Sequence, residues 1–198
     1  MVENSQPVVP GVQEHPSLAL VNSVTDQPGS RRHDDLADPV AATAWLVDRD
    51  LVAPEAVLYE HCRGRLAELR AELRELFTAH VTGRPPKPEA VAALNRALTS
   101  APGAMLLRHH PTMGFSRSAD HPATQVVENA MAVIAEDAAA LLAGDDASLL
   151  AACESDSCQW FFLRTHARRQ WCSNRCGDRV RAARAYARRH AVLSEQTS

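Results

Sequence analysis

Cys153-Glu154-Ser155-Asp156-Ser157-Cys158 is followed, after thirteen residues, by Cys172-Ser173-Asn174-Arg175-Cys176. Four of the five cysteines of this 198-residue chain therefore fall within 24 positions, in two close pairs. Each pair can bind one side of a metal ion, and two pairs complete the tetrahedron that zinc prefers. Because four thiolates leave no open position for a substrate, the pattern predicts one structural zinc ion. Its predicted ligands are Cys153, Cys158, Cys172 and Cys176.

Two disulfides are the competing interpretation of the same cysteine pairs. The first seven residues lack the basic and apolar segments of a secretory signal. No apolar run approaches the roughly 20 residues that a membrane span needs. We therefore expect a cytoplasmic protein with no membrane partner. Thiols stay reduced in that compartment, so paired cysteines there favour metal binding over disulfides.

The residues around the second cysteine pair resemble a known family. Cys176-Gly177-Asp178-Arg179 is similar to the Cys-Gly-Asn-Arg signature of the CGNR zinc-finger family, with aspartate in place of the family's asparagine. An aspartate only accepts hydrogen bonds, so Asp178 changes any contact in which the family's asparagine acts as a donor. The aromatic run and the approach to the second pair also match, at Trp160, Phe161, Phe162, Arg168, Arg169, Trp171 and Ser173.

The N-terminal part resembles the ABATE domain, a helical module that usually precedes this finger. The similar stretches are His15–Ser23, Asp35–Pro39 and Ala44–Leu46. The resemblance spans roughly residues 15–191 and implies a bacterial, stress-induced transcription regulator. It divides the chain into a disordered tail (1–14), an ABATE-like helical domain (15–146), a CGNR-type finger with a basic C-terminal helix (147–192) and a second tail (193–198).

Helical periodicity predicts a mainly α fold. Apolar residues recur every three or four positions, which indicates a bundle of five or six helices. We expect helices at about 17–24, 39–49, 54–80, 88–98 and 122–143, with Asp38-Pro39 starting the second of them. The segment 101–121 is irregular and fits a small β-hairpin.

For the zinc module we predict a treble-clef-like arrangement. The first cysteine pair lies in a loop, Gln159–Leu163 forms a strand, and Trp171 begins a second strand. A helix from about 174 to 191 follows, with Ser173 as its N-cap. Its N-terminus favours the negative charge of the thiolates. Three apolar residues of this helix are expected to pack back on the two strands: Val180, Ala183 and Ala187.

Charge is distributed unevenly along the chain. Residues 1–152 have a net charge of −8, whereas residues 153–198 contain nine arginines and four acidic residues, a net charge of +5. A basic segment on an acidic body indicates a local anionic partner, and with the zinc module it favours duplex DNA. The expected contacts are Arg168, Arg169, Arg175, Arg179, Arg181, Arg184 and Arg188. The alternative is that these arginines are only solvated or pair with the acidic body.

Two other functions stay open at this point. The helical domain can be the working part, as a binding protein for a small-molecule effector or as an enzyme, with the finger as scaffold. A pocket for that role is expected at Trp45, Phe77, His109 and His110. The other alternative is a protein-interaction adaptor. A homodimer is compatible with a regulator that reads paired half-sites.

Overall fold

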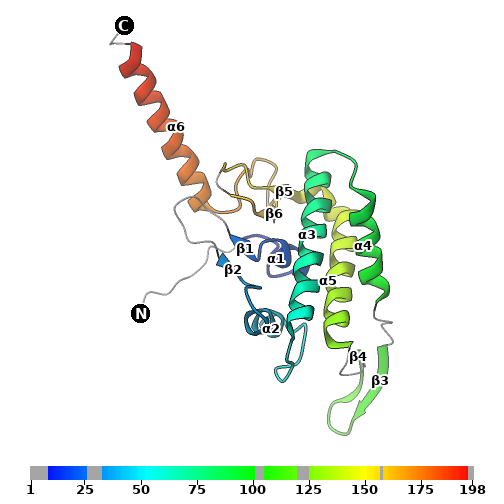
Figure 1. Ribbon diagram of the computed structural model, residues 1–198. Coiled ribbons are helices and arrows are strands. Elements are labelled where there is room, and N and C mark those ends of the chain that lie inside the picture. Colours follow the sequence, from blue (N-terminus) through cyan, green and yellow to red (C-terminus); the bar gives the residue numbers. More distant parts are fainter. Residues whose placement is uncertain (1–8, 26–32, 101–104, 120–124, 157, 196–198) are drawn as a thin grey trace.

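The computed structural model describes residues 9–25, 33–100, 105–119, 125–156 and 158–195, and its fold is mainly α, as predicted (Figure 1). The helices are α1 (Pro16–Val21), α2 (Pro39–Val47), α3 (Glu60–Thr82), α4 (Pro88–Thr99), α5 (Val126–Ala143) and α6 (Asn174–Glu195), with the 3-10 helix η2 (Asp145–Leu149). Three antiparallel strand pairs join β1 (Val24–Thr25) to β2 (His33–Asp34), β3 (Met105–His110) to β4 (Gly114–Ala119), and β5 (Leu150–Ala152) to β6 (Phe161–Leu163).

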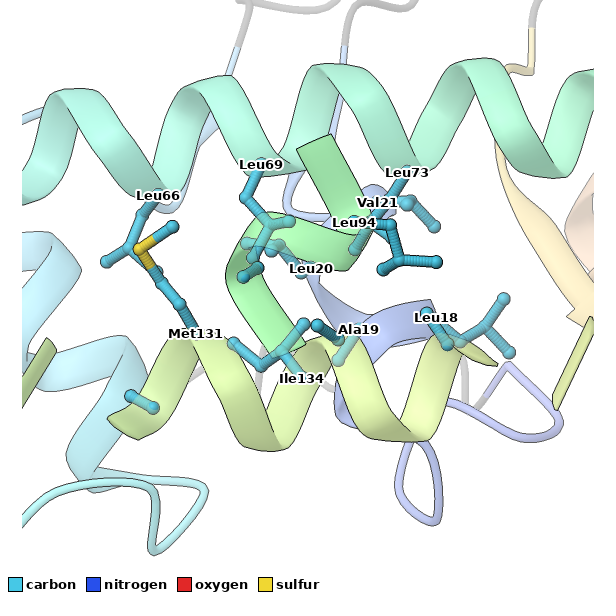
Figure 2. Packing of buried hydrophobic residues seen from close by; sticks show 14 of the residues in the cluster. Leu18, Ala19, Leu20, Val21, Leu66, Leu69, Leu73, Leu94, Met131 and Ile134 are labelled. Carbon is cyan, nitrogen blue, oxygen red and sulfur yellow. The ribbon is translucent and has the colours of Figure 1, made fainter. Parts of the chain in front are cut away.

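The core of the N-terminal body lies between α1, α3, α4 and α5 (Figures 1 and 2). Leucines at helical spacing on α3 point towards α5, and the apolar residues of α1 fill the space between these two helices. The labelled side chains of this core in Figure 2 are Leu18, Ala19, Leu20, Val21, Leu66, Leu69, Leu73, Leu94, Met131 and Ile134, all of which are buried.

The helix boundaries follow local signals with one correction. Asp38 caps α2 by accepting a hydrogen bond from the backbone N–H of Ala41 (2.8 Å), and Gly83 ends α3 in the left-handed conformation with φ of 66°. The predicted start of α3 at Pro54 is wrong, because the helix begins at Glu60 and residues 53–59 form a turn and an extended segment. The predicted start at Pro122 lies outside the described residues.

The short helix α1 is positioned by polar contacts. Asp137 of α5 accepts hydrogen bonds from the backbone N–H of Ser17 (2.9 Å) and lies 2.8 Å from Nδ1 of His15. This carboxylate therefore satisfies the backbone N–H of Ser17 at the start of α1, as an N-cap residue would. Arg70 of α3 forms an ion pair with Asp34 (2.6 Å) and so connects β2 to the bundle.

The zinc module is attached to the body through β6. The Asn22 side chain donates to the carbonyl of Phe161 (2.8 Å) and accepts from its N–H (2.9 Å). Phe161 packs edge-on against Phe77 of α3, with ring centroids 5.7 Å apart, in the core of the body. The next residue, Phe162, faces the opposite way and lies in a second apolar cluster, around the cysteines.

Strand pairing in the zinc module differs from the prediction. The predicted strand at 159–163 is present in part, as β6, but its partner is β5, with Ala151 opposite Phe162. Trp171, the expected start of the second strand, lies outside any strand. The partner strand β5 is a three-residue apolar segment directly before the first cysteine.

The N-terminal segment also differs from the expected tail over its described part. Val9 is buried in the cluster around the cysteines, and the carbonyl of Pro10 accepts a hydrogen bond from the N–H of Leu163 (3.0 Å). Gly11 has a φ of 86°, and a Cβ there would lie 2.6 Å from the Leu163 side chain. Residues 9–11 therefore extend the β5–β6 pair along its free edge.

We predict that Asn22→Ala destabilises the fold by about 2–4 kcal/mol, because it leaves two buried backbone groups of Phe161 without partners. The free energy of unfolding is measured by urea denaturation of the zinc-loaded protein. Asn95→Ala is the matched control, since Asn95 is exposed on α4. An equal loss in both variants would contradict the assigned role of Asn22.

Candidate metal centre

The four predicted cysteines meet in one buried cluster. Their Sγ atoms all lie within 4.8 Å of one another, and Sγ of Cys172 is 3.7 Å from Sγ of both Cys158 and Cys176. Cys62, the fifth cysteine, lies on α3 and does not belong to the cluster. The residues brought together are therefore the two pairs that the sequence predicts.

Three of the four ligands are positioned by a hydrogen bond from their own backbone N–H. Cys153 directly follows β5, and its N–H donates to the carbonyl of Trp160 (2.9 Å), which continues the β5–β6 ladder by one step. The N–H of Cys158 donates to the carbonyl of Ser155 (2.7 Å), which closes the loop between the first two ligands. Cys176 lies in the first turn of α6, where its N–H donates to Oγ of Ser173 (3.3 Å), so the predicted N-cap is confirmed.

The distances between the sulfurs fit a tetrahedral zinc ion. With Zn–S bonds of about 2.3 Å, the corners of a regular tetrahedron lie about 3.8 Å apart, close to the 3.7 Å seen for two pairs. A disulfide requires about 2.05 Å between the sulfurs, and all five cysteines are free. The cluster is thus positioned to bind one structural zinc ion through four thiolates.

The thiols influence one another strongly in the absence of a cation. Hydrogen bonding to Cys153 raises the pKa of Cys158 to about 12 and also raises the pKa of Cys172, because each of these thiols donates to the same sulfur. Hydrogen bonds from Cys158 and Cys172 lower the pKa of Cys153. Zinc binding at neutral pH must therefore displace protons, and acidification favours release of the metal.

A tightly fitted surface surrounds the ligands. The Arg169 guanidinium donates to the carbonyls of Trp171 (3.0 Å) and Cys172 (3.0 Å), so it holds the loop that enters α6. A Cβ on Gly177 would approach the Trp171 ring to 3.0 Å, which explains why a glycine follows the last ligand. Oδ1 of Asp178 accepts from the Arg181 guanidinium (2.6 Å), which lies 5.7 Å from the centre of the same ring.

The comparison with family models agrees with this geometry. Residues 14–145 match the model of the ABATE family, described as "Putative stress-induced transcription regulator", and residues 150–189 match the CGNR zinc finger. The chain belongs to the ABATE family. No curated protein matches the chain. The order of the two matches is that expected for an ABATE protein with a CGNR finger, and the matched finger runs from the start of β5 through most of α6.

The seven arginines predicted to contact nucleic acid differ in their exposure and in their protein contacts. Arg169 is occupied by backbone carbonyls of the finger, and Arg181 is paired with Asp178. Arg179 is half-buried near the start of α6. The remaining four arginines are exposed: Arg168, Arg175, Arg184 and Arg188.

The four residues predicted to line a pocket are not brought together. Phe77 is fully buried against Phe161, and Trp45 is buried in the same core. His109 packs beside Phe115 on the exposed β3–β4 hairpin, where His110 is exposed as well. The hairpin itself was predicted correctly, but its two histidines are exposed to solvent.

Among the described residues, no helix has both the length and the apolarity needed to cross a membrane.

Three polar residues that hold α1 or the finger on the body were not predicted as site residues from the sequence. Arg74 of α3 donates to the carbonyls of Val21 (2.7 Å) and Gln159 (2.9 Å), next to the second ligand. Burial lowers the pKa of this arginine. Asn22 and Asp137 are the other two.

We predict that Cys172→Ser loses stoichiometric zinc and unfolds the finger, because a four-thiolate site loses a central ligand and the small module depends on the metal. Zinc content per chain is measured after gel filtration in a buffer without free metal. Cys62→Ser is the matched control and should retain one equivalent. A full equivalent in Cys172→Ser would exclude the four-cysteine site.

Proposed function

We propose that this ABATE protein is a DNA-binding transcription regulator that contacts duplex DNA with α6. The observation that supports this proposal is the position of the helix. Its first turn carries Cys176 and is fixed by the zinc site, and the rest extends away from the body (Figure 1). With 22 residues it is about 33 Å long. Such a projecting helix can enter a major groove without collision of the body with the duplex.

The surface of α6 is exposed beyond its first turns. Ala183 and Ala187, which were expected to pack on the strands, are exposed, and Val180 is only half-buried. Tyr186 is 65% exposed and packs beside His190, with the ring centroids 4.1 Å apart and the rings tilted by 48°. An isolated helix gains little stability from burial, and its exposure is consistent with a partner that covers it in the functional complex.

The arginines of α6 lie on two sides of the helix. At about 100° per residue, Arg181, Arg184 and Arg188 share one side. Arg175, Arg179 and Arg189 lie on the opposite side. Phosphates line both walls of a major groove, so two basic stripes match an inserted helix better than one stripe would.

The acidic body supports a contact confined to the finger. Residues 1–152 have a net charge of −8, against +5 for residues 153–198. Four zinc-bound thiolates with one Zn²⁺ lower the second value by two, and the segment stays basic. The body is therefore repelled by the phosphate backbone, which favours an end-on approach through α6.

We predict that Arg184→Ala with Arg188→Ala weakens binding to duplex DNA and lowers the slope of log K against log salt by about 2, because each phosphate contact contributes about 0.9. Binding is measured by fluorescence anisotropy at several salt concentrations on duplexes enriched from a random pool. Zinc content is checked in parallel, since both residues lie far along α6 from the ligands.

Lys87→Ala with Arg96→Ala is the control matched in charge, because Lys87 directly before α4 and Arg96 on α4 are both exposed. It should leave the salt slope unchanged. Failure of the zinc-loaded protein to enrich any duplex would overturn the proposal and favour a protein partner for α6. An equal effect of both double variants would mean that the contact depends on general charge.

A second prediction concerns the departure from the family signature at Asp178. Asp178→Asn removes one negative charge from α6 and releases the Arg181 guanidinium from its ion pair. We expect the affinity for duplex DNA to rise about fivefold, which corresponds to roughly 1 kcal/mol for one charge near a phosphate in water. The same anisotropy titration checks this, with the exposed Asp145→Asn on η2 as control. A decrease in affinity would assign the carboxylate a positive role in binding.

A further inference from the structure

A small cavity of about 230 Å³ lies where the body meets the zinc module. Most of its wall comes from the N-terminal third of the chain, and one residue, Trp160, comes from the finger. The wall combines an apolar part with a few polar groups. Its lining residues include Val9, Val12, Ala19, Asn22, Asp35, Arg49 and Trp160.

Arg49 brings a poorly compensated positive charge to this cavity. Its guanidinium lies 4.2 Å from the centre of the Trp45 ring and donates to the carbonyl of Trp45 (3.1 Å). Burial lowers the pKa of Arg49, and this effect exceeds the attraction of Asp35 and Asp48. Within the described part of the chain, no ion pair involves Arg49. Among these residues, the Trp45 carbonyl is the one hydrogen-bond acceptor of its guanidinium.

Trp160 brings a second unused donor. Its indole Nε1 is shielded from solvent and has no hydrogen-bond acceptor among the described residues. A buried donor without a partner destabilises the fold. A small rotation of the Trp160 ring would let this N–H donate to an acceptor atom of a ligand in the cavity, which would remove that cost. The other polar groups nearby are already engaged: Asn22 binds Phe161, and Asp35 binds His33 (2.7 Å).

We propose that this cavity binds a small organic acid. The carboxylate accepts hydrogen bonds from the Arg49 guanidinium and the Trp160 indole N–H, and the apolar part of the ligand packs on Val9, Val12 and Ala19. The volume is below the range typical of drug-sized ligands, so it selects a compact molecule. A single carboxylate matches a guanidinium without an ion pair and an indole N–H without an acceptor, both in the described part of the chain.

The position of Trp160 makes this a site that regulates DNA binding by α6. This regulatory role depends on the proposed function. The residue lies between Cys158 and β6, and its carbonyl accepts the hydrogen bond from Cys153. A ligand that holds the Trp160 ring therefore restrains the strand that joins the zinc ligands to the body. Binding itself does not depend on whether α6 contacts DNA.

A larger cavity of about 500 Å³ between α3, α4 and α5 is the competing site. It also contains an arginine, Arg84, at its wall. Both oxygens of Glu75 accept hydrogen bonds from that guanidinium, at 2.8 and 2.7 Å. Its charge is already neutralised, so this cavity is suited to a neutral apolar molecule more than to an anion.

The test uses benzoate as the acidic probe, with benzamide as the neutral analogue and inorganic phosphate as a simple anion. The full-length zinc-loaded protein is labelled with ¹⁵N, and the indole N–H resonances of its three tryptophans are followed. We expect benzoate to shift the Trp160 indole resonance and to leave that of Trp171 in place. Benzamide should bind at least about tenfold more weakly, since a hydrogen bond to a charged group is lost.

Calorimetry of variants locates the site. Trp160→Phe and Arg49→Met should each weaken benzoate binding at least about tenfold, whereas Trp171→Phe and Arg84→Met should not. Absence of benzoate binding, phosphate binding without benzoate binding, or a loss in Arg84→Met alone would overturn the proposal. A benzoate complex in a protein that binds no duplex DNA would keep the site and reject only its regulatory role.

Discussion

The strand β6 is the constraint on which the rest of the structure depends. Side chains of a strand alternate between its two faces, so Phe161 enters the core of the body while Phe162 enters the apolar cluster around the cysteines. A strand of only three residues thereby contributes side chains to both cores. The reciprocal hydrogen bonds of Asn22 fix the register of this strand, because a shift by one residue would exchange the two phenylalanines.

Zinc extends this constraint to the end of the chain. The first two ligands flank the β5–β6 pair, and the last two lie at the start of α6, so one ion fixes the direction of the helix relative to the body. A module of this size buries too little apolar surface to do so alone. The fused arrangement gives α6 a rigid base, although no other element of the described residues covers its length (Figure 1).

The parts that were predictable from the sequence are those with local causes. Cysteine spacing gave the ligands, and helical periodicity gave the bundle, because both are encoded within a few turns of chain. The pairing of β5 with β6 was missed, since a three-residue strand is too short to show alternation. Asn22 was missed because its partner, Phe161, is 139 residues away. Helical periodicity predicted a packed face at Ala183 and Ala187, which are exposed. Periodicity shows which residues share a face of a helix, but not whether another element packs on that face.

The ABATE motif itself takes on a structural meaning from these contacts. His15 and Ser17 bind Asp137, and Asn22 binds Phe161, so the polar residues of the motif hold α1 between α5 and the finger. Residues with satisfied partners of this kind are poor candidates for ligand contacts. Spare hydrogen-bonding capacity remains at the Arg49–Trp160 cavity, and α6 carries exposed charge. Trp160 connects the two, because it lines the cavity and its carbonyl accepts the hydrogen bond from the N–H of the ligand Cys153, so the proposed acid would act on α6 through the position of Trp160.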